Sequence, residues 1–146
     1  MKATKKTIFS LFFILCLMLS SCNSTDKEHE LLKHEWAIEV ISDYDGNVLK
    51  SNLKYSDSMD HYDMVLTFDK DTFLLSDNTN SEEWGGRYTI EKVGSGSSYK
   101  IDLYCEDSET VITGVYGIRK YDDKTEVQSI TLQTEDKILS FIEKEL

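Results

Sequence analysis

The chain of 146 residues contains no proline and only three cysteines. Proline lacks the N–H group that a β-ladder needs, so a chain without it suits long, uninterrupted strands. The same absence removes one common protection of exposed sheet edges, and a closed barrel has no such edges. For a β-sheet protein this favours a barrel over an open sandwich.

Positive charge is also scarce, with 16 Lys and Arg against 27 Asp and Glu and a net charge of −11. The first 21 residues hold three lysines and no acid, so the remaining 125 residues carry −14. Phosphate binding needs clustered basic side chains, which argues against nucleic acid or an anionic lipid surface as a partner. Two interpretations stay open: solubility, or an acidic face for a basic protein partner.

The chain has one long apolar run, from Ile8 to Leu19, which follows Lys2, Lys5 and Lys6. It is about a dozen residues long, whereas a helix that spans a bilayer needs roughly 20. A basic start followed by a short apolar run is typical of a secretory signal. We therefore expect residues 1–21 to be removed as a signal peptide.

The run ends in Leu19-Ser20-Ser21-Cys22, which resembles the lipobox of bacterial lipoproteins. The resemblance implies cleavage before Cys22, lipidation of this residue and a membrane as partner through the lipid. An ordinary signal peptide with a chance cysteine is the alternative. Asn23 carries no cue for inner-membrane retention, so by resemblance to lipoprotein sorting we expect a cell-envelope protein of the outer membrane.

The rest of the chain divides into a polar tether, 22–30, and a single domain, 31–146. Residues 25–28, Thr-Asp-Lys-Glu, have the form of a capping box and predict one short N-terminal helix before Leu32. With Cys16 removed and Cys22 lipidated, Cys105 has no partner for an intrachain disulfide.

Beyond Trp36, short stretches rich in Val, Ile, Thr, Tyr and Phe alternate with Asp, Asn, Gly and Ser clusters, which predicts strands joined by turns. Clear turns include Asp45-Gly46-Asn47 and residues 94–97. We expect 111–121 to be the longest strand, with Gly114 and Gly117 as candidate bend or bulge positions. Eight or nine strands are expected, at 36–40, 48–55, 64–68, 72–76, 84–90, 99–105, 111–121, 127–134 and 138–143.

Because the turns are short and no helix is long enough for a crossover, neighbouring strands must pair antiparallel. The predicted fold class is all-β: an antiparallel up-and-down meander that closes into an eight- or nine-stranded barrel with one short N-terminal helix.

The order of four motifs resembles the small lipocalin-like domains of bacterial lipoproteins, over about residues 31–146. These domains open with a leucine, a short gap and a tryptophan, and usually carry a glycine where His34 stands here. The matching segments are Leu32 to Trp36, Phe68-Asp69-Lys70-Asp71-Thr72-Phe73, Gly86-Arg87-Tyr88 and Leu139-Ser140-Phe141.

The resemblance implies a barrel whose interior is either filled by side chains or large enough for one small ligand. It also implies that Trp36 plugs the closed end under an arginine, for which Arg119 is the nearest candidate. The residues expected inward, as ligand-binding candidates or simply as core, are Trp36, Phe68, Tyr88, Tyr99, Ile101 and Tyr116. Trp84, beside an acidic loop, is expected to be exposed.

No enzyme, cofactor or metal signature is found. His61 lies among acids, but the spacing matches no metal motif. Residues 43–47 resemble a calcium loop only superficially and predict a turn. Cys105 alternates with Tyr99, Ile101 and Leu103, which indicates a buried thiol rather than a nucleophile.

The sequence is consistent with two functions. The first is a lipid-tethered barrel that binds a small apolar ligand. The second is an acidic inhibitor, immunity-like or assembly protein that binds a basic protein partner in the envelope.

Overall fold

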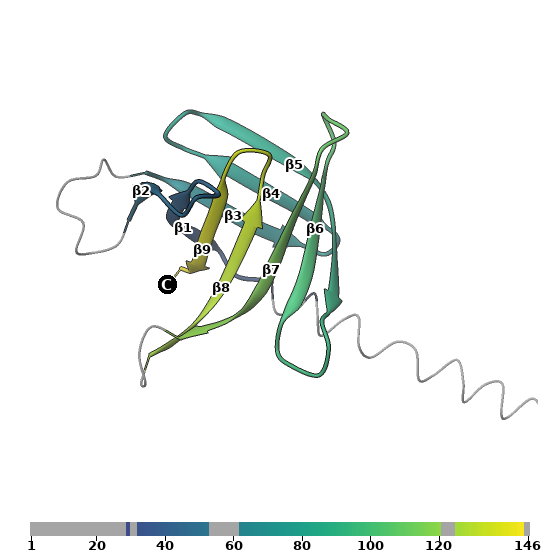
Figure 1. Ribbon diagram of the computed structural model, residues 1–146. Helices are drawn as coiled ribbons and strands as arrows, with labels where there is room; N and C mark the ends of the chain where they lie inside the picture. Colours follow the sequence, from purple (N-terminus) through teal and green to yellow (C-terminus); the bar gives the residue numbers. More distant parts are fainter. Residues whose placement is uncertain (1–28, 30–31, 53–61, 121–124, 145–146) are drawn as a thin grey trace, which may run out of the picture.

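The structure, a computed structural model, describes residue 29 and residues 32–52, 62–120 and 125–144. This part of the chain is all-β, as predicted, and Figure 1 shows its strands curling into a barrel. The strands are β1 (Trp36–Ser42), β2 (Val48–Ser51), β3 (Met64–Asp69), β4 (Thr72–Asp77), β5 (Glu82–Lys92), β6 (Tyr99–Cys105), β7 (Val111–Lys120), β8 (Glu126–Gln133) and β9 (Ile138–Glu143).

From β3 to β9 every strand pairs antiparallel with the next along the chain, which confirms the meander. Pairing of β1 with both β3 and β9 closes an eight-stranded barrel. The additional strand, β2, pairs with the second half of β1. Thus β2 and β3 share one edge of β1, β3 along Trp36 and Ala37, and β2 from Val40 to Ser42.

Asn52 holds the junction where β2 and β3 part. Its backbone N–H donates to Glu39 O and its side-chain amide donates to Ile38 O and Tyr62 O. In return Tyr62 N–H donates to Asn52 Oδ1 at 3.1 Å. One side chain therefore satisfies backbone groups that the interrupted ladder would leave unpaired.

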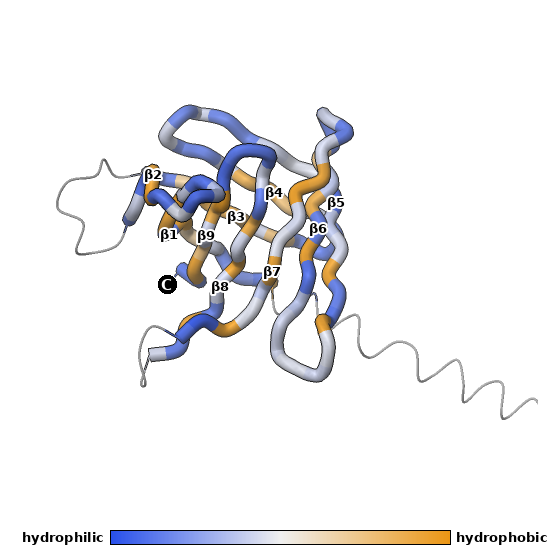
Figure 2. Tube along the Cα trace, viewed as in Figure 1, coloured by the Kyte–Doolittle hydropathy of each residue, from blue (hydrophilic) through white to orange (hydrophobic). Residues whose placement is uncertain are grey.

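The core lies inside the barrel, because side chains of a strand point alternately to its two faces. In β3 and β4 buried residues alternate with more exposed ones. Figure 2 shows the matching alternation of apolar and hydrophilic positions, with mainly hydrophilic β4–β5, β6–β7 and β8–β9 turns. The fully enclosed side chains include Trp36, Leu66, Ile130, Leu132 and Phe141.

Within the described residues the longest strand is β5, with 11 residues, and β7 has 10 up to Lys120, where this described segment ends. The expected bend or bulge positions in the segment 111–121 are wrong. The ladder irregularities lie in β1, between Ile38 and Val40 and between Ile41 and Ser42, and none interrupts β7. Gly114 instead permits close packing, because a Cβ there would lie 2.6 Å from Thr131 O.

The signal segment, the lipobox, His61 and most of the predicted N-terminal helix lie outside the described residues. Among the residues that are described, no helix has the length and apolar character needed to cross a bilayer. The segment before β1 is nevertheless attached to the barrel, since Leu32 is completely buried.

Candidate functional site

One end of the barrel is filled by aromatic side chains. Trp36 packs edge-to-face on Tyr116, with ring centroids 5.7 Å apart, and Tyr99 lies at the same distance from Tyr116. Phe68 packs edge-to-face on Tyr88 at 4.8 Å. Such pairs stabilise a core beyond their burial alone. We call the end of the barrel that holds these two aromatic groups the floor.

His29 ties the N-terminal segment to this floor. Tyr88 O–H donates to Lys70 O at 2.8 Å, and His29 Nδ1 lies 2.6 Å from the same hydroxyl oxygen. A hydroxyl has one proton, so His29 must be the donor in the second bond. Burial, together with the nearby Asp71 and Asp69, raises the pKa of Tyr88 to about 12, so this hydroxyl keeps its proton.

An ion pair links strands β1 and β7. Arg119 of β7 forms an ion pair with the buried Glu39, three residues after Trp36 on β1. This is the arginine that the sequence suggested as a cover for the tryptophan, and its carboxylate partner was not anticipated.

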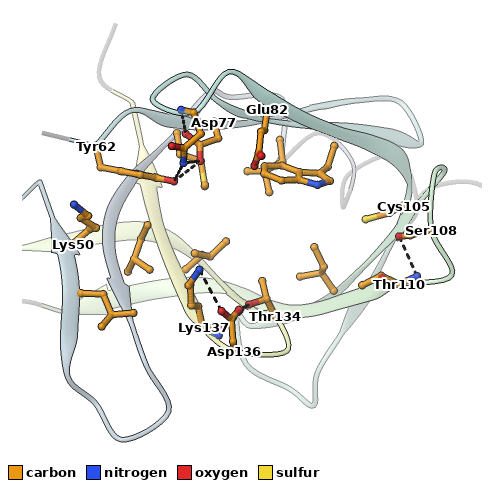
Figure 3. Close-up of a pocket in the computed structure, with 18 residues that line it drawn as sticks. Lys50, Tyr62, Asp77, Glu82, Cys105, Ser108, Thr110, Thr134, Asp136 and Lys137 are labelled. Carbon is orange, nitrogen blue, oxygen red and sulfur yellow. Dashed lines mark hydrogen bonds and ion pairs between the residues drawn. The ribbon is translucent and has the colours of Figure 1, made fainter.

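The opposite end of the barrel is hollow and holds a cavity of about 470 Å³. The first residues of β3, β5 and β7 and the last of β4 and β6 line it, together with β1, β2 and the β8–β9 turn. Figure 3 looks into this cavity, which we call the mouth. Its buried apolar wall is made by Ile41, Met64, Leu75, Ile112 and Leu139.

The six residues expected to contact a ligand are placed elsewhere. Five of them are buried, Tyr99 is half-buried, and none lines the mouth. The structure places the five aromatic residues among them at the floor, in the groups Trp36–Tyr116–Tyr99 and Phe68–Tyr88. Ile101 is a fully buried core residue. Trp84, expected to be exposed, is 37% exposed and lines the mouth. The mouth, rather than the floor, is therefore the candidate binding site.

A hydrogen-bonded group occupies one side of the mouth, as Figure 3 shows. The Asp77 carboxylate is buried and accepts the Tyr62 hydroxyl, Asn80 N–H at 3.0 Å and Asn80 Nδ2 at 2.8 Å. Burial alone would raise the pKa of Asp77, but the hydrogen bonds from Tyr62 and Asn80 outweigh it and lower the pKa. Burial and the Asp77 charge raise the pKa of Tyr62 to about 12.

Asp77→Asn is expected to destabilise the protein by about 1–3 kcal/mol at neutral pH, because buried donors lose an ionised acceptor. The folded pKa of Asp77 lies below 3.8, so its stabilisation is present above that pH and is lost as the pH falls through the folded value. Urea unfolding at several pH values should show the difference between variant and parent shrinking in acid. The exposed Asp107→Asn is the control; a pH-independent difference for Asp77→Asn would contradict the assignment.

Acidic residues gather around the mouth. The four turns at this end, taken with the adjoining strand ends of β4 and β5, are residues 43–47, 77–83, 106–110 and 134–137, and they contain ten acidic residues and one lysine. The described segments at the floor end contain five acidic and six basic residues: 32–35, 69–72, 92–98, 119–120, 125–126 and 143–144. Figure 1 shows the β4–β5, β6–β7 and β8–β9 turns together at the top. Among the described end segments, the negative charge is thus concentrated at the mouth.

Cys105 is a free, half-buried thiol that packs against the core and also lines the mouth. Burial raises its pKa, which the Asp107 charge reinforces and a hydrogen bond with Ser108 opposes. A raised pKa leaves little thiolate at neutral pH and argues against nucleophilic use. Within the described ranges no three His, Cys, Asp or Glu side chains are placed to hold a metal ion.

Comparisons of the chain with protein-family models, with curated proteins and with solved structures found no match. The mouth was missed at the sequence level because large inward-facing residues were favoured as candidates. One signal could have found it. In a meander, every second turn lies at the same end of the barrel, and three of the four segments at the mouth end, 43–47, 77–83 and 106–110, contain acidic residues and no basic one.

Proposed function

We propose that this protein is a lipid-anchored, lipocalin-like protein of the cell envelope that binds one small, largely apolar molecule in the mouth. The observation that carries the proposal is the cavity itself: an apolar wall with polar groups at its rim, at one end of a closed barrel. Its volume falls within the range of small-molecule sites, about 300–1,000 Å³.

The positions of the four motifs support the lipocalin-like interpretation. The segment from Phe68 to Phe73 is the β3–β4 hairpin, with both phenylalanines buried. Gly86 lies where β5 approaches β6, and Phe141 on β9 faces the core. Trp36 sits in the floor, the place the resemblance implies for it.

A lipid on Cys22 would set the orientation of the mouth. His29 is attached at the floor and Leu32 is buried, and six residues, 23–28, lie between Cys22 and His29. A chain of this length spans at most about 25 Å. Such a tether would keep the floor end near the membrane, and we expect the mouth to face away from it.

The acidic rim favours a second candidate function, an inhibitor, immunity-like or assembly protein that binds a basic protein partner. Such binding would weaken steeply with salt and would involve no molecule inside the mouth.

The test is extraction of the full-length protein purified from membranes, followed by mass spectrometry of what co-purifies. Ile112→Trp fills the mouth, whereas Val115→Trp puts the same bulk on the exposed face of the same strand. We expect a near-stoichiometric small molecule with the parent and Val115→Trp, and its loss with Ile112→Trp. Equal yields of the small molecule from all three proteins, or no co-purifying molecule, would defeat the proposal. The intact mass of the protein separately reports cleavage and lipidation at Cys22.

A further inference from the structure

We propose that the ligand of the mouth carries a positive charge: an organic ammonium compound whose apolar part enters the cavity and whose cationic group meets Glu82 beside Trp84. This inference rests on the proposed function and names the ligand class of the same cavity.

The partners of the acidic residues in the mouth single out Glu82. Three carboxylates line the cavity. Asp77 is satisfied by Tyr62 and Asn80, and Asp136 pairs with Lys137 at 3.3 Å. Glu82 makes no hydrogen bond or ion pair with any described residue, and Figure 3 shows its carboxylate pointing into the cavity. Its charge is available to a ligand.

Trp84 adds a second feature that suits a cation. Residues two apart on a strand share a face, so Glu82 and Trp84 both face the mouth from the start of β5. The indole is 37% exposed, more than a core packing role requires. An indole face attracts ammonium groups through its quadrupole, and a neighbouring carboxylate supplies the opposite charge.

The electrostatic field of the surrounding acidic residues also favours a cation. Ten acidic residues and one lysine lie in the four turns around the opening and in the adjoining ends of β4 and β5, so a cation is attracted toward the opening and an anion is repelled. Lys50 also lines the mouth and has no ion pair among the described residues. It comes from β2, and Figure 3 places it at the side of the cavity, on the Tyr62 side rather than with Glu82. One lysine does not offset the acidic turns.

The experiment uses phenylbutylamine, phenylbutanol and phenylbutanoate, which share a body and differ in head group. Each is titrated into the full-length protein in lipid nanodiscs, with empty nanodiscs as the blank, and followed by calorimetry. We expect the amine to bind at least about tenfold more tightly than the alcohol, the anion to bind most weakly, and high salt to weaken only the amine.

Glu82→Gln and Glu83→Gln form the matched pair, since Glu83 instead hydrogen-bonds to Ser76 at 3.3 Å. Glu82→Gln should lower amine affinity about tenfold and leave the alcohol unchanged, while Glu83→Gln should change little. Equal binding of amine and alcohol would overturn the inference and leave the proposed function standing. Tighter binding of the anion, equal effects of the two variants, or binding of none of the three compounds would each overturn it as well.

Discussion

Gly86→Ala is expected to destabilise the barrel by about 3 kcal/mol or more, because the added methyl group has no space. A Cβ at this position would lie 1.9 Å from Tyr104 O and 3.2 Å from Cys105 Cα. Both atoms belong to the backbone of β6, which pairs with β5 through Gly86 and Cys105. Relief of the clash requires the two strands to move apart, and that movement breaks ladder hydrogen bonds.

The neighbouring glycine provides the control. A Cβ on Gly85 would make ordinary contacts, 3.6 Å to Phe73 O and 3.9 Å to Leu74 Cδ1. Gly85→Ala should therefore be neutral or stabilise by up to about 1 kcal/mol, since alanine restricts the unfolded chain. Urea unfolding of the two variants and the parent measures the difference. Similar midpoints for both variants would refute the close approach of β5 and β6.

Trp36→Ala is expected to cost about 3–5 kcal/mol, a large part of the stability of a small domain. Trp36 is completely buried and packs on Tyr116, so its removal leaves a hole in the floor. Trp36→Phe should cost far less. The indole Nε1 is buried with no hydrogen-bond partner among the described residues, and phenylalanine removes this unsatisfied donor.

The two tryptophans report on different ends of the barrel, Trp36 on the floor and Trp84 on the mouth. Trp36 is fully buried and Trp84 is 37% exposed. Acrylamide should therefore strongly quench the fluorescence of Trp36→Phe, which keeps the exposed Trp84, and weakly quench that of Trp84→Phe, which keeps the buried Trp36. Because Trp36 does not line the mouth, Trp36→Phe should keep the co-purified ligand. Loss of that ligand from Trp36→Phe, at unchanged unfolding free energy, would show that the floor takes part in binding.

Local patterns in the chain predicted most of the strands. Side-chain alternation with period two, as in Met64, Leu66 and Phe68, identifies a buried face within a few residues. Turns such as Asp43 to Asn47 are also local, and there the Asp43 carboxylate accepts Asn47 N–H at 2.8 Å. The second strand, in contrast, was predicted to reach residue 55 and ends at Ser51.

The candidate site was predicted less well than the fold. Large inward residues such as Tyr88 and Tyr116 were correctly expected to face the interior, but an inward face runs the whole height of a barrel. Whether it meets a packed floor or an open mouth depends on height along the barrel axis. Trp84 and Tyr88 lie on the same face of one strand, yet they lie at opposite ends of the interior.

The amino-acid sequence alone determined the basic start with its short apolar run, the lipobox-like tetrapeptide, the strand periodicity, the turns and the excess of acid. Tertiary structure alone decided which end is hollow, which acids surround it, and that β2 shares an edge of β1 with β3. The reason is physical: alternation and turn formation are settled by neighbours along the chain, whereas register, closure and the meeting of separate turns depend on strands far apart in sequence. Glu82 and Asp136 share a cavity only because the ladder closes between β1 and β9.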